Sequence, residues 1–364
     1  MKHKILTLML LTVLCLLSSF ACATTTWYVN GVSGSDGHNC LSSATACKTI
    51  GHALSLSLSG DMILVAAATY KENLKIGKSL NIVGSGASTT IIDGGGVGTV
   101  ITISSSSAHV SLSRMTIRNG FGSSGNGFGG GGGIVNMGTL TINKSTISGN
   151  IARGMPGQGG GLLNRGTLTV NSSTLMGNVV SGIFGAGFGG AIFNYGTLRI
   201  NNATISGNIA SGKGGGINNA GNLALNNTTI SGNSSTYGAN GSGGLANGAQ
   251  AILQNTIIAN NSRGNCNGPM TSHGYNLSSD NSCNFDGPGD MDNTNPLLGP
   301  LQNNGGPTFT QALISGSPAI DAGNPSGCND GQGHLLKTDQ RGMPRPDLED
   351  AGGCDMGAFE RQTD

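Results

Sequence analysis

The chain has 364 residues, of which 65 are glycine and only 10% are charged, and its formal net charge is +1. This balance excludes a strongly charged disordered chain and gives no reason to expect a nucleic-acid partner. An aromatic content of 4% beside so much glycine is typical of a repeat architecture with many turns.

The first 23 residues are predicted to be a secretory signal. Lys2 and Lys4 precede an apolar run, and Ala21-Cys22-Ala23 matches a small-x-small cleavage site. No later stretch has the ~20 apolar residues of a membrane helix. We therefore expect a mature chain that is extracellular or periplasmic, cleaved near Ala23. Lipidation of Cys22 is the alternative, although the residues before it fit a lipobox poorly.

Six cysteines remain after that cleavage. An even number in an exported chain favours disulfides over free thiols. A metal site is the weaker interpretation, because there is no C-x-x-C pair and no histidine cluster. Of the 15 pairings that six cysteines allow, we favour the local ones, Cys40–Cys47, Cys266–Cys283 and Cys328–Cys354.

Residues 24–59 are predicted to form an N-terminal cap. Ile50, Leu54 and Leu58 are spaced by four residues, as on one face of a helix. Such a helix would cover the exposed strand edges of a first coil. Short strands are expected directly after it, at residues 63–66, 80–83 and 90–92.

Five copies of one pattern follow, with spacings of 28, 30, 25 and 28 residues between their first asparagines. Within a copy, apolar residues such as Leu140 and Ile142 alternate with polar ones, which is the period of a β-strand. The segments are short and leave no room for helices between them. A period of this length predicts a stacked array, here an all-β parallel β-helix with three short strands per coil. We assign residues 60–262 to the coils and residues 263–364 to a C-terminal cap module.

Alignment of the copies predicts columns of equivalent residues. The inward aliphatic column is Ile117, Ile147, Leu175, Ile205, Ile230 and Ile257. The outward column is Thr116, Thr146, Thr174, Thr204, Thr229 and Thr256. Two asparagine columns mark turns, one being Asn136, Asn164, Asn194, Asn219 and Asn247, and the other Asn143, Asn171, Asn201 and Asn226. The threonines are interpreted as ordinary outward strand residues, with ice or flat-glycan binding as the alternative.

The sequence resembles the secreted bacterial right-handed parallel β-helix proteins of pectin-lyase-like fold that carry a choice-of-anchor C-terminal region. The matching segments are residues 27–40, 60–94 and 296–324, together with TDQRGMPRP at 338–346 and CDMGAFE at 354–360. The central copies are also similar to polymorphic outer-membrane-protein repeats, with GGAI at 189–192. The resemblance implies an exported, right-handed β-helix and does not imply one particular reaction.

The same fold hosts polysaccharide lyases and glycoside hydrolases, which need carboxylates for acid–base chemistry or for calcium. Residues 95–279 contain eight Lys and Arg and no Asp or Glu, a net charge of +8. We therefore predict no catalytic residues, and the question of an enzyme stays open. A metal-free lyase built from Tyr195, Arg165 and Arg199 is the alternative that survives this objection.

Binding is the favoured interpretation of the basic coils. Arg114 and Lys144 align in one column and Arg118 and Ser148 in another, so stacked cations would face an anionic polysaccharide or lipopolysaccharide. The candidate ligand-binding residues are Arg114, Arg118, Lys144, Arg165, Tyr195 and Arg199. No cofactor is expected apart from a candidate structural calcium ion, whose ligands would be Asp286, Asp290 and Asp292. A purely structural exported protein is the remaining alternative. The oligomeric state is not predicted.

Overall fold

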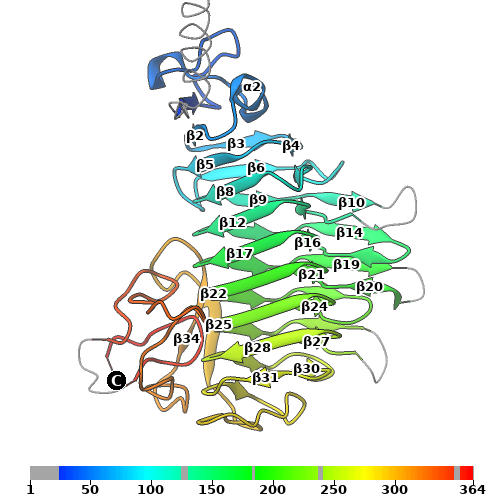
Figure 1. The fold of residues 1–364 in the computed structure, drawn as a ribbon, viewed down its shortest axis with the longest axis vertical. Coiled ribbons are helices and arrows are strands. Elements are labelled where there is room, and N and C mark those ends of the chain that lie inside the picture. Colours follow the sequence, from blue (N-terminus) through cyan, green and yellow to red (C-terminus); the bar gives the residue numbers. More distant parts are fainter. Residues whose placement is uncertain (1–23, 124–129, 183–184, 237–240, 348–352, 364) are drawn as a thin grey trace, which may run out of the picture.

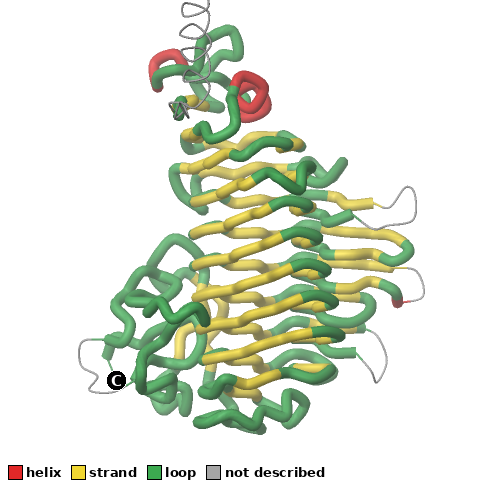
Figure 2. The backbone as a smooth tube through the Cα atoms, viewed as in Figure 1, coloured by secondary structure: helices red, strands yellow, loops and turns green. Residues whose placement is uncertain are grey.

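The computed structural model describes residues 24–123, 130–182, 185–236, 241–347 and 353–363. Parallel strands stack coil upon coil into a right-handed β-helix, which confirms the fold predicted from the repeats (Figure 1). Figure 2 shows the two largest helical segments at the N-terminal end, while the body consists mainly of strands joined by turns. Within the described residues, no helix is long and apolar enough to cross a membrane.

The largest sheet, called the long sheet below, has 17 strands among the described residues. Each coil contributes one or two strands, and each strand pairs in parallel with its equivalent in the next coil. The strands are β1 (Thr26–Val29), β2 (Met62–Val65), β3 (Ala68–Lys71), β5 (Leu80–Gly84), β6 (Thr90–Asp93), β8 (His109–Ser113), β9 (Thr116–Arg118), β12 (Thr139–Asn143), β13 (Thr146–Ser148), β17 (Thr167–Asn171), β18 (Thr174–Met176), β22 (Thr197–Ser206), β25 (Asn222–Ser231), β28 (Gln250–Gln254), β29 (Ile257–Ala259), β31 (Thr271–Ser272) and β32 (Leu277–Ser278).

Two further parallel sheets complete the coils. The second sheet contains β4 (Leu74–Ile76), β7 (Ile101–Ile103), β11 (Ile134–Asn136), β16 (Leu162–Asn164), β21 (Ile192–Asn194), β24 (Ile217–Asn219), β27 (Leu245–Asn247) and β30 (Cys266–Asn267). The lateral sheet contains β10 (Phe121–Ser123), β14 (Ile151–Gly154), β19 (Val179–Gly182), β23 (Ile209–Ala210) and β26 (Ser234–Ser235), and the short pair β15 (Gly157–Gln158) and β20 (Gly187–Phe188) lies beside it.

The N-terminal end is covered by helix α2 (Ile50–Leu56), where the spacing of apolar residues predicts one. Both carboxylate oxygens of Glu72 accept hydrogen bonds from the free backbone N–H groups of Ile50 and Gly51, at 2.9 and 2.7 Å. The side chain of Thr49 caps the same end. A short 3-10 helix, η1 (Ser43–Thr45), precedes α2.

The inward aliphatic column is present, with one correction in the last copy. Ile117, Ile147, Leu175, Ile205 and Ile230 are fully buried and pair in register as predicted. Ile230, however, pairs with Ile258, and Thr229 pairs with Ile257. The sequence alignment placed Thr256-Ile257 against Thr229-Ile230 because both are Thr-Ile dipeptides. In the structure these strands keep the same register as the Asn222–Gln250 pair, which shifts the last copy by one residue. The prediction for Thr256 and Ile257 was therefore wrong by one residue.

A third asparagine column runs inside the coils, at the end of each copy. Its members are fully or almost fully buried, and the Nδ2 of each donates to the Oδ1 of the next at 2.9–3.1 Å. They are Asn150, Asn178, Asn208, Asn233, Asn261 and Asn265. These hydrogen bonds satisfy polar groups at a buried corner where an aliphatic residue would leave backbone carbonyls unpaired.

The residues after 262 first continue the coils. Strand pairing continues through β30, β31 and β32, and a bridge joins Leu277 to Met291, so the coils extend past residue 262. Residues 296–347 and 353–363, called the C-terminal segment below, then turn back and lie along the side of the coils, against β22 and β25 (Figure 1). A hairpin within this segment joins β33 (Leu298–Gln302) and β34 (Thr310–Leu313).

The outward threonine column is the surface on which this segment lies. Thr174, Thr204 and Thr229 are buried, while Thr116 and Thr146 are only half-buried. Thr174 Oγ1 donates to the Phe309 carbonyl at 2.6 Å, and Thr229 Oγ1 accepts from the Ala358 N–H at 3.1 Å. The prediction of a solvent-facing threonine column was therefore wrong for the later coils, because a distant part of the chain covers them.

Disulfides join Cys40–Cys47, Cys266–Cys283 and Cys328–Cys354, the three local pairs favoured from the sequence. The first fixes the loop before α2, the second lies in the last coil, and the third holds the C-terminal segment together. In an exported chain such bonds persist, and each restricts the unfolded state.

Candidate functional site

The outer surface of the long sheet is open over its first coils. An outward column runs along it in register through Tyr28, Leu64, Val83, Ser113 and Asn143. The loop between β1 and α2 (residues 30–49), called the N-terminal loop below, bounds this stretch at one end. The C-terminal segment bounds it at the other end (Figure 1). We call this stretch the open groove.

Two hollows lie in the open groove. The first, of about 320 Å³, is lined by Tyr28, Leu64, Val83 and Arg114 together with the loop at Ala46. The second, of about 180 Å³, lies where Thr116 and Thr146 meet Phe309 of the C-terminal segment. The groove is therefore shaped by both ends of the chain.

Arg114 and Lys144 stand at one corner of successive coils, as predicted. Flanking pairs Ser113–Asn143 and Thr116–Thr146 place them in register, and both have positive φ, 60° and 47°. Both side chains are exposed. Within the described part of the chain, neither has a carboxylate within 4.0 Å; Arg114 Nη2 donates to the Ser85 carbonyl at 2.9 Å. Their charges are therefore not neutralised by the fold.

Arg118, by contrast, forms a salt bridge with Asp93. Its Nε donates to Asp93 Oδ2 at 2.9 Å, and Asn119 Nδ2 donates to the same oxygen at 2.8 Å. Burial alone would raise the pKa of Asp93, but the hydrogen bonds from Gly95, Arg118 and Asn119 outweigh it and keep that pKa below its usual value. Arg118 thus stabilises a buried acid, which weakens its candidacy as a ligand residue.

The structure does not gather Tyr195, Arg165 and Arg199 into one site. The Arg165 guanidinium lies 5.4 Å from the centre of the Tyr195 ring, and both follow strands of the second sheet. The Tyr195 hydroxyl accepts from Gln158 Nε2 at 2.7 Å. Arg199 is on the long sheet and donates to the Asp330 carbonyl at 3.0 Å. A uronate held by all three residues does not fit this arrangement.

Two of the three candidate calcium ligands already accept hydrogen bonds from backbone N–H groups. Asp290 accepts from the N–H groups of Asn276 and Gly287 at 2.7 and 2.6 Å, and Asp292 accepts from Phe285 at 2.8 Å. Burial, together with the charges of Asp290 and Asp280, raises the pKa of Asp292. In the described ranges, these carboxylates do not bring three ligand atoms within 4.8 Å of one another. Calcium binding stays a prediction.

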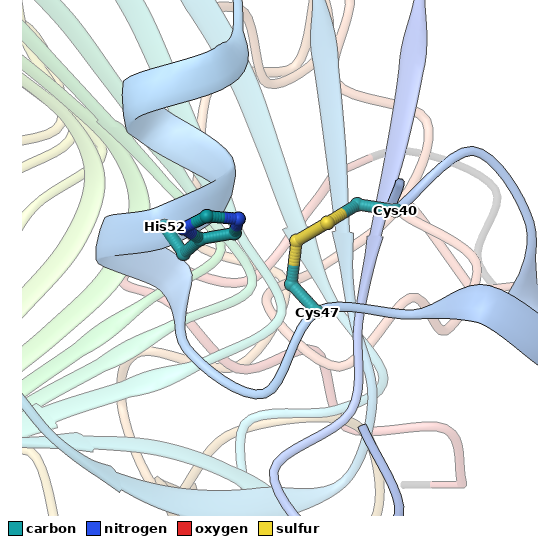
Figure 3. A group of neighbouring side chains, drawn as sticks. All are labelled: Cys40, Cys47 and His52. Carbon is teal, nitrogen blue, oxygen red and sulfur yellow. A yellow bond between two sulfur atoms is a disulfide. The ribbon is translucent and has the colours of Figure 1, made fainter. Parts of the chain in front are cut away.

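Among the described residues, the potential ligand atoms of Cys40, Cys47 and His52 do lie within 4.8 Å of one another. Figure 3 shows the His52 ring on α2 facing the sulfur atoms of the two cysteines. Because these sulfur atoms are bonded to each other, neither offers the thiolate that binds a metal ion. The cluster is structural.

The buried acids of the C-terminal segment serve its own packing. Arg345 Nε donates to Glu360 Oε2 at 2.6 Å, and both side chains are fully buried. Arg341 pairs with Asp339 at 2.7 Å and lies 3.7 Å from the centre of the Phe359 ring. These groups are enclosed, so they offer no acid–base pair to a ligand in the open groove.

No protein-family model matches the sequence, and no curated protein matches it. Solved structures are similar at low identity. The pectate lyase Pel9A is 14% identical over 92% of this chain and 96% of its own, with a TM-score of 0.47. A rhamnogalacturonan lyase is 12% identical over 83% and 86%, with a TM-score of 0.43. Pectin methylesterase PemA from Erwinia chrysanthemi is 15% identical over 70% and 89%, with a TM-score of 0.39. Similarity at this level assigns no activity to the chain.

Sequence reasoning missed the apolar part of the open groove. Leu64 and Val83 were placed on strands, but the first coils lie outside the repeat, so no alignment indicated which face they occupy. Tyr28 lies in β1, which pairs with β2 of the first coil. The alternation of Met62 to Val65 was a usable signal, because it separates two outward from two inward residues.

Proposed function

We propose that this chain is an exported, non-catalytic β-helix protein that binds anionic polysaccharide in the open groove, at a cell surface or in an extracellular matrix. The observation that carries this proposal is the Arg114–Lys144 pair. Both cations project from the same corner of adjacent coils, and no carboxylate of the described residues lies within 4.0 Å of either. Adjacent strands of a sheet are ~4.8 Å apart, so the pair presents charge at a regular, short interval.

The surroundings favour a polyanion over a neutral ligand. Residues 95–279 contribute eight cations and no acid, so the coils attract negative charge as a whole. A polymer that repeats a carboxylate or phosphate would meet this surface at several points. Acidic polysaccharide and lipopolysaccharide share that chemistry, and only direct binding to each distinguishes them.

Separate observations support export and the absence of catalysis. Three disulfides suit an oxidising compartment, as does the resemblance to secreted β-helix proteins. A hydrolase needs two carboxylates ~5–10 Å apart across its substrate. The lining of the open groove supplies none. The lyase or hydrolase alternative therefore has no acid pair at the proposed site.

The test is to incubate the purified chain with polygalacturonate, a lipopolysaccharide and a neutral glucan, with and without calcium. Bound fraction and polymer length are measured at low salt and at about 200 mM salt. The proposal predicts salt-sensitive binding to the acidic polymers, no binding to the glucan and unchanged lengths. Shortened polymers would establish the enzyme alternative, and no binding to any polymer would favour a purely structural protein.

A further inference from the structure

The outward column of the long sheet changes chemistry along its length. At the N-terminal end it presents Tyr28, Leu64 and Val83, which are half-buried. Two coils later the same column presents Asn143 and Asn171, whose side chains hydrogen-bond at 2.9 Å. The first coils thus display an apolar strip where the later coils display amides.

Among the residues that the structure describes, none fills the space over this strip. The pocket of about 320 Å³ lies there, bounded by Ala46 and Ser43 of the N-terminal loop. Ligand pockets for small groups begin at about 300 Å³, so the space suits one sugar unit with its substituent and is too small for a long chain.

The walls of the pocket are fixed before any ligand arrives. The Tyr28 N–H donates to the Cys40 carbonyl, and the Cys47 N–H donates to the Tyr28 carbonyl, both at 2.8 Å. These hydrogen bonds join the loop to β1, and the disulfide between the two cysteines closes the loop on itself. A preformed wall reduces the entropy lost when a ligand binds.

Arg114 supplies the charge at the edge of the pocket. Its guanidinium lines the cavity and is held by the Ser85 carbonyl, which leaves its positive charge without a counter-ion. An anionic group on Arg114 therefore brings a neighbouring substituent of the same ligand over Leu64 and Val83.

We propose that this pocket is a subsite for an acetyl ester on an acidic polysaccharide, with the polymer's carboxylate on Arg114 and the acetyl methyl on the strip of Tyr28, Leu64 and Val83. This inference rests on the proposed function and specifies its ligand. An acetyl ester leaves the carboxylate charged and adds one compact apolar group, which is the combination that the pocket and the cation accept together.

The test compares one acetylated acidic polysaccharide with the same polymer after mild alkaline deacetylation. Burying one methyl group strengthens binding by about fivefold, so the wild-type chain should prefer the acetylated form by about that factor. The key variant is Val83→Ser. The fold accepts serine in this column, because Ser113 occupies the paired position in the next coil.

Val83→Ser should lose most of the acetyl preference, measured as the ratio of its affinities for the acetylated and the deacetylated polymer. The matched control is Val179→Ser, on the lateral sheet away from the pocket, which should keep the preference. Equal wild-type affinity for both polymers, or a preference that survives in Val83→Ser, would overturn the acetyl subsite while leaving polyanion binding intact. Failure of the wild-type chain to bind either polymer would overturn both proposals.

Discussion

Gln340 and Thr204, 136 residues apart in the chain, form a buried hydrogen bond of 2.7 Å between the C-terminal segment and the coils. Thr204 Oγ1 donates to Gln340 Oε1, and Gln340 Nε2 donates to Thr174 Oγ1 and to Thr308 Oγ1, each at 2.9 Å. One amide thus connects two coils to the segment. This contact converts a repetitive outward column into a specific docking surface and sets one boundary of the open groove.

Gln340→Ala should loosen the C-terminal segment. The change leaves the buried Thr204 hydroxyl without its acceptor and removes the hydrogen bonds from Gln340 Nε2 to Thr174 and Thr308. We therefore expect the free energy of opening of the segment to fall by about 2–3 kcal/mol. Limited proteolysis under native conditions measures this opening. Gln332→Ala, at an exposed glutamine of the same segment, is the control and should leave the cleavage rate unchanged. Equal rates for both variants would contradict the docking role of Gln340.

The buried asparagine column should be much more sensitive than the surface column. Asn178 Oδ1 accepts from Asn150, while its Nδ2 donates to the Ile147 carbonyl and to Asn208 Oδ1. Asn178→Ala leaves several buried polar groups without a hydrogen-bond partner. It should therefore lower the free energy of unfolding by about 3–5 kcal/mol. Urea denaturation followed by circular dichroism measures the loss.

Asn143→Ala is the matched control for that experiment. Asn143 is half-buried and receives one side-chain hydrogen bond, from Asn171 at 2.9 Å. Because water replaces that partner, the loss should stay below about 1 kcal/mol. Similar losses at the two positions would show that the inner column does not stabilise the coils as its hydrogen bonds indicate.

The C-terminal segment should be weakened by rising pH. Burial raises the pKa of Asp355 to about 6 and that of Glu360 to about 8, from ordinary values of 3.8 and 4.5, although Arg345 opposes both shifts. The folded segment therefore holds protons that the unfolded chain releases. Its stability is greatest below the ordinary pKa values, and it falls as pH rises through about 6 and again through about 8.

For Asp355, that loss amounts to about 2 kcal/mol between pH 4 and pH 6. Asp355→Asn should remove the contribution of Asp355 and leave that of Glu360, whereas Asp286→Asn, at an exposed acid, should leave the whole pH dependence unchanged. Proteolytic opening of the segment at several pH values gives the readout. If the wild-type segment becomes more resistant to proteolysis from pH 4 to pH 6, the predicted direction of the pH dependence is wrong.

The local part of the fold could be predicted from the sequence. Recurring residues such as Ile117 and Ile147 reveal their pairing because equivalent positions stack, and the apolar spacing after Ile50 reveals the helix. The buried column also had a signal in the sequence, since every copy except the last ends in SGN or MGN, and the final residue of that motif is Asn150, Asn178, Asn208 or Asn233.

The long-range part could not be predicted in this way. Docking of Gln340 on Thr204 joins segments with no shared pattern, so no periodicity reports it. For the same reason Thr204 had the signature of a solvent-facing residue. The apolar strip at Leu64 and Val83 lies in coils outside the repeat. Its pocket also depends on a loop that a disulfide holds in place.

Removal of charge from the open groove tests the central claim most directly. The variant is Arg114→Asn with Lys144→Asn, because asparagine occupies the same corner with positive φ at Asn202, Asn227 and Asn255. The fold should therefore be retained while two charges are lost. A control with the same loss of charge is Lys75→Ala with Arg153→Ala, two exposed cations on other sheets.

The measurement is the dissociation constant for polygalacturonate at low salt. At about 1 kcal/mol for each exposed charge contact, the groove variant should bind at least about tenfold more weakly, with a smaller dependence on salt, and the control should bind much as the wild-type chain does. Equal affinity of the groove variant and the wild-type chain, or an equal loss in the control, would contradict binding in the open groove.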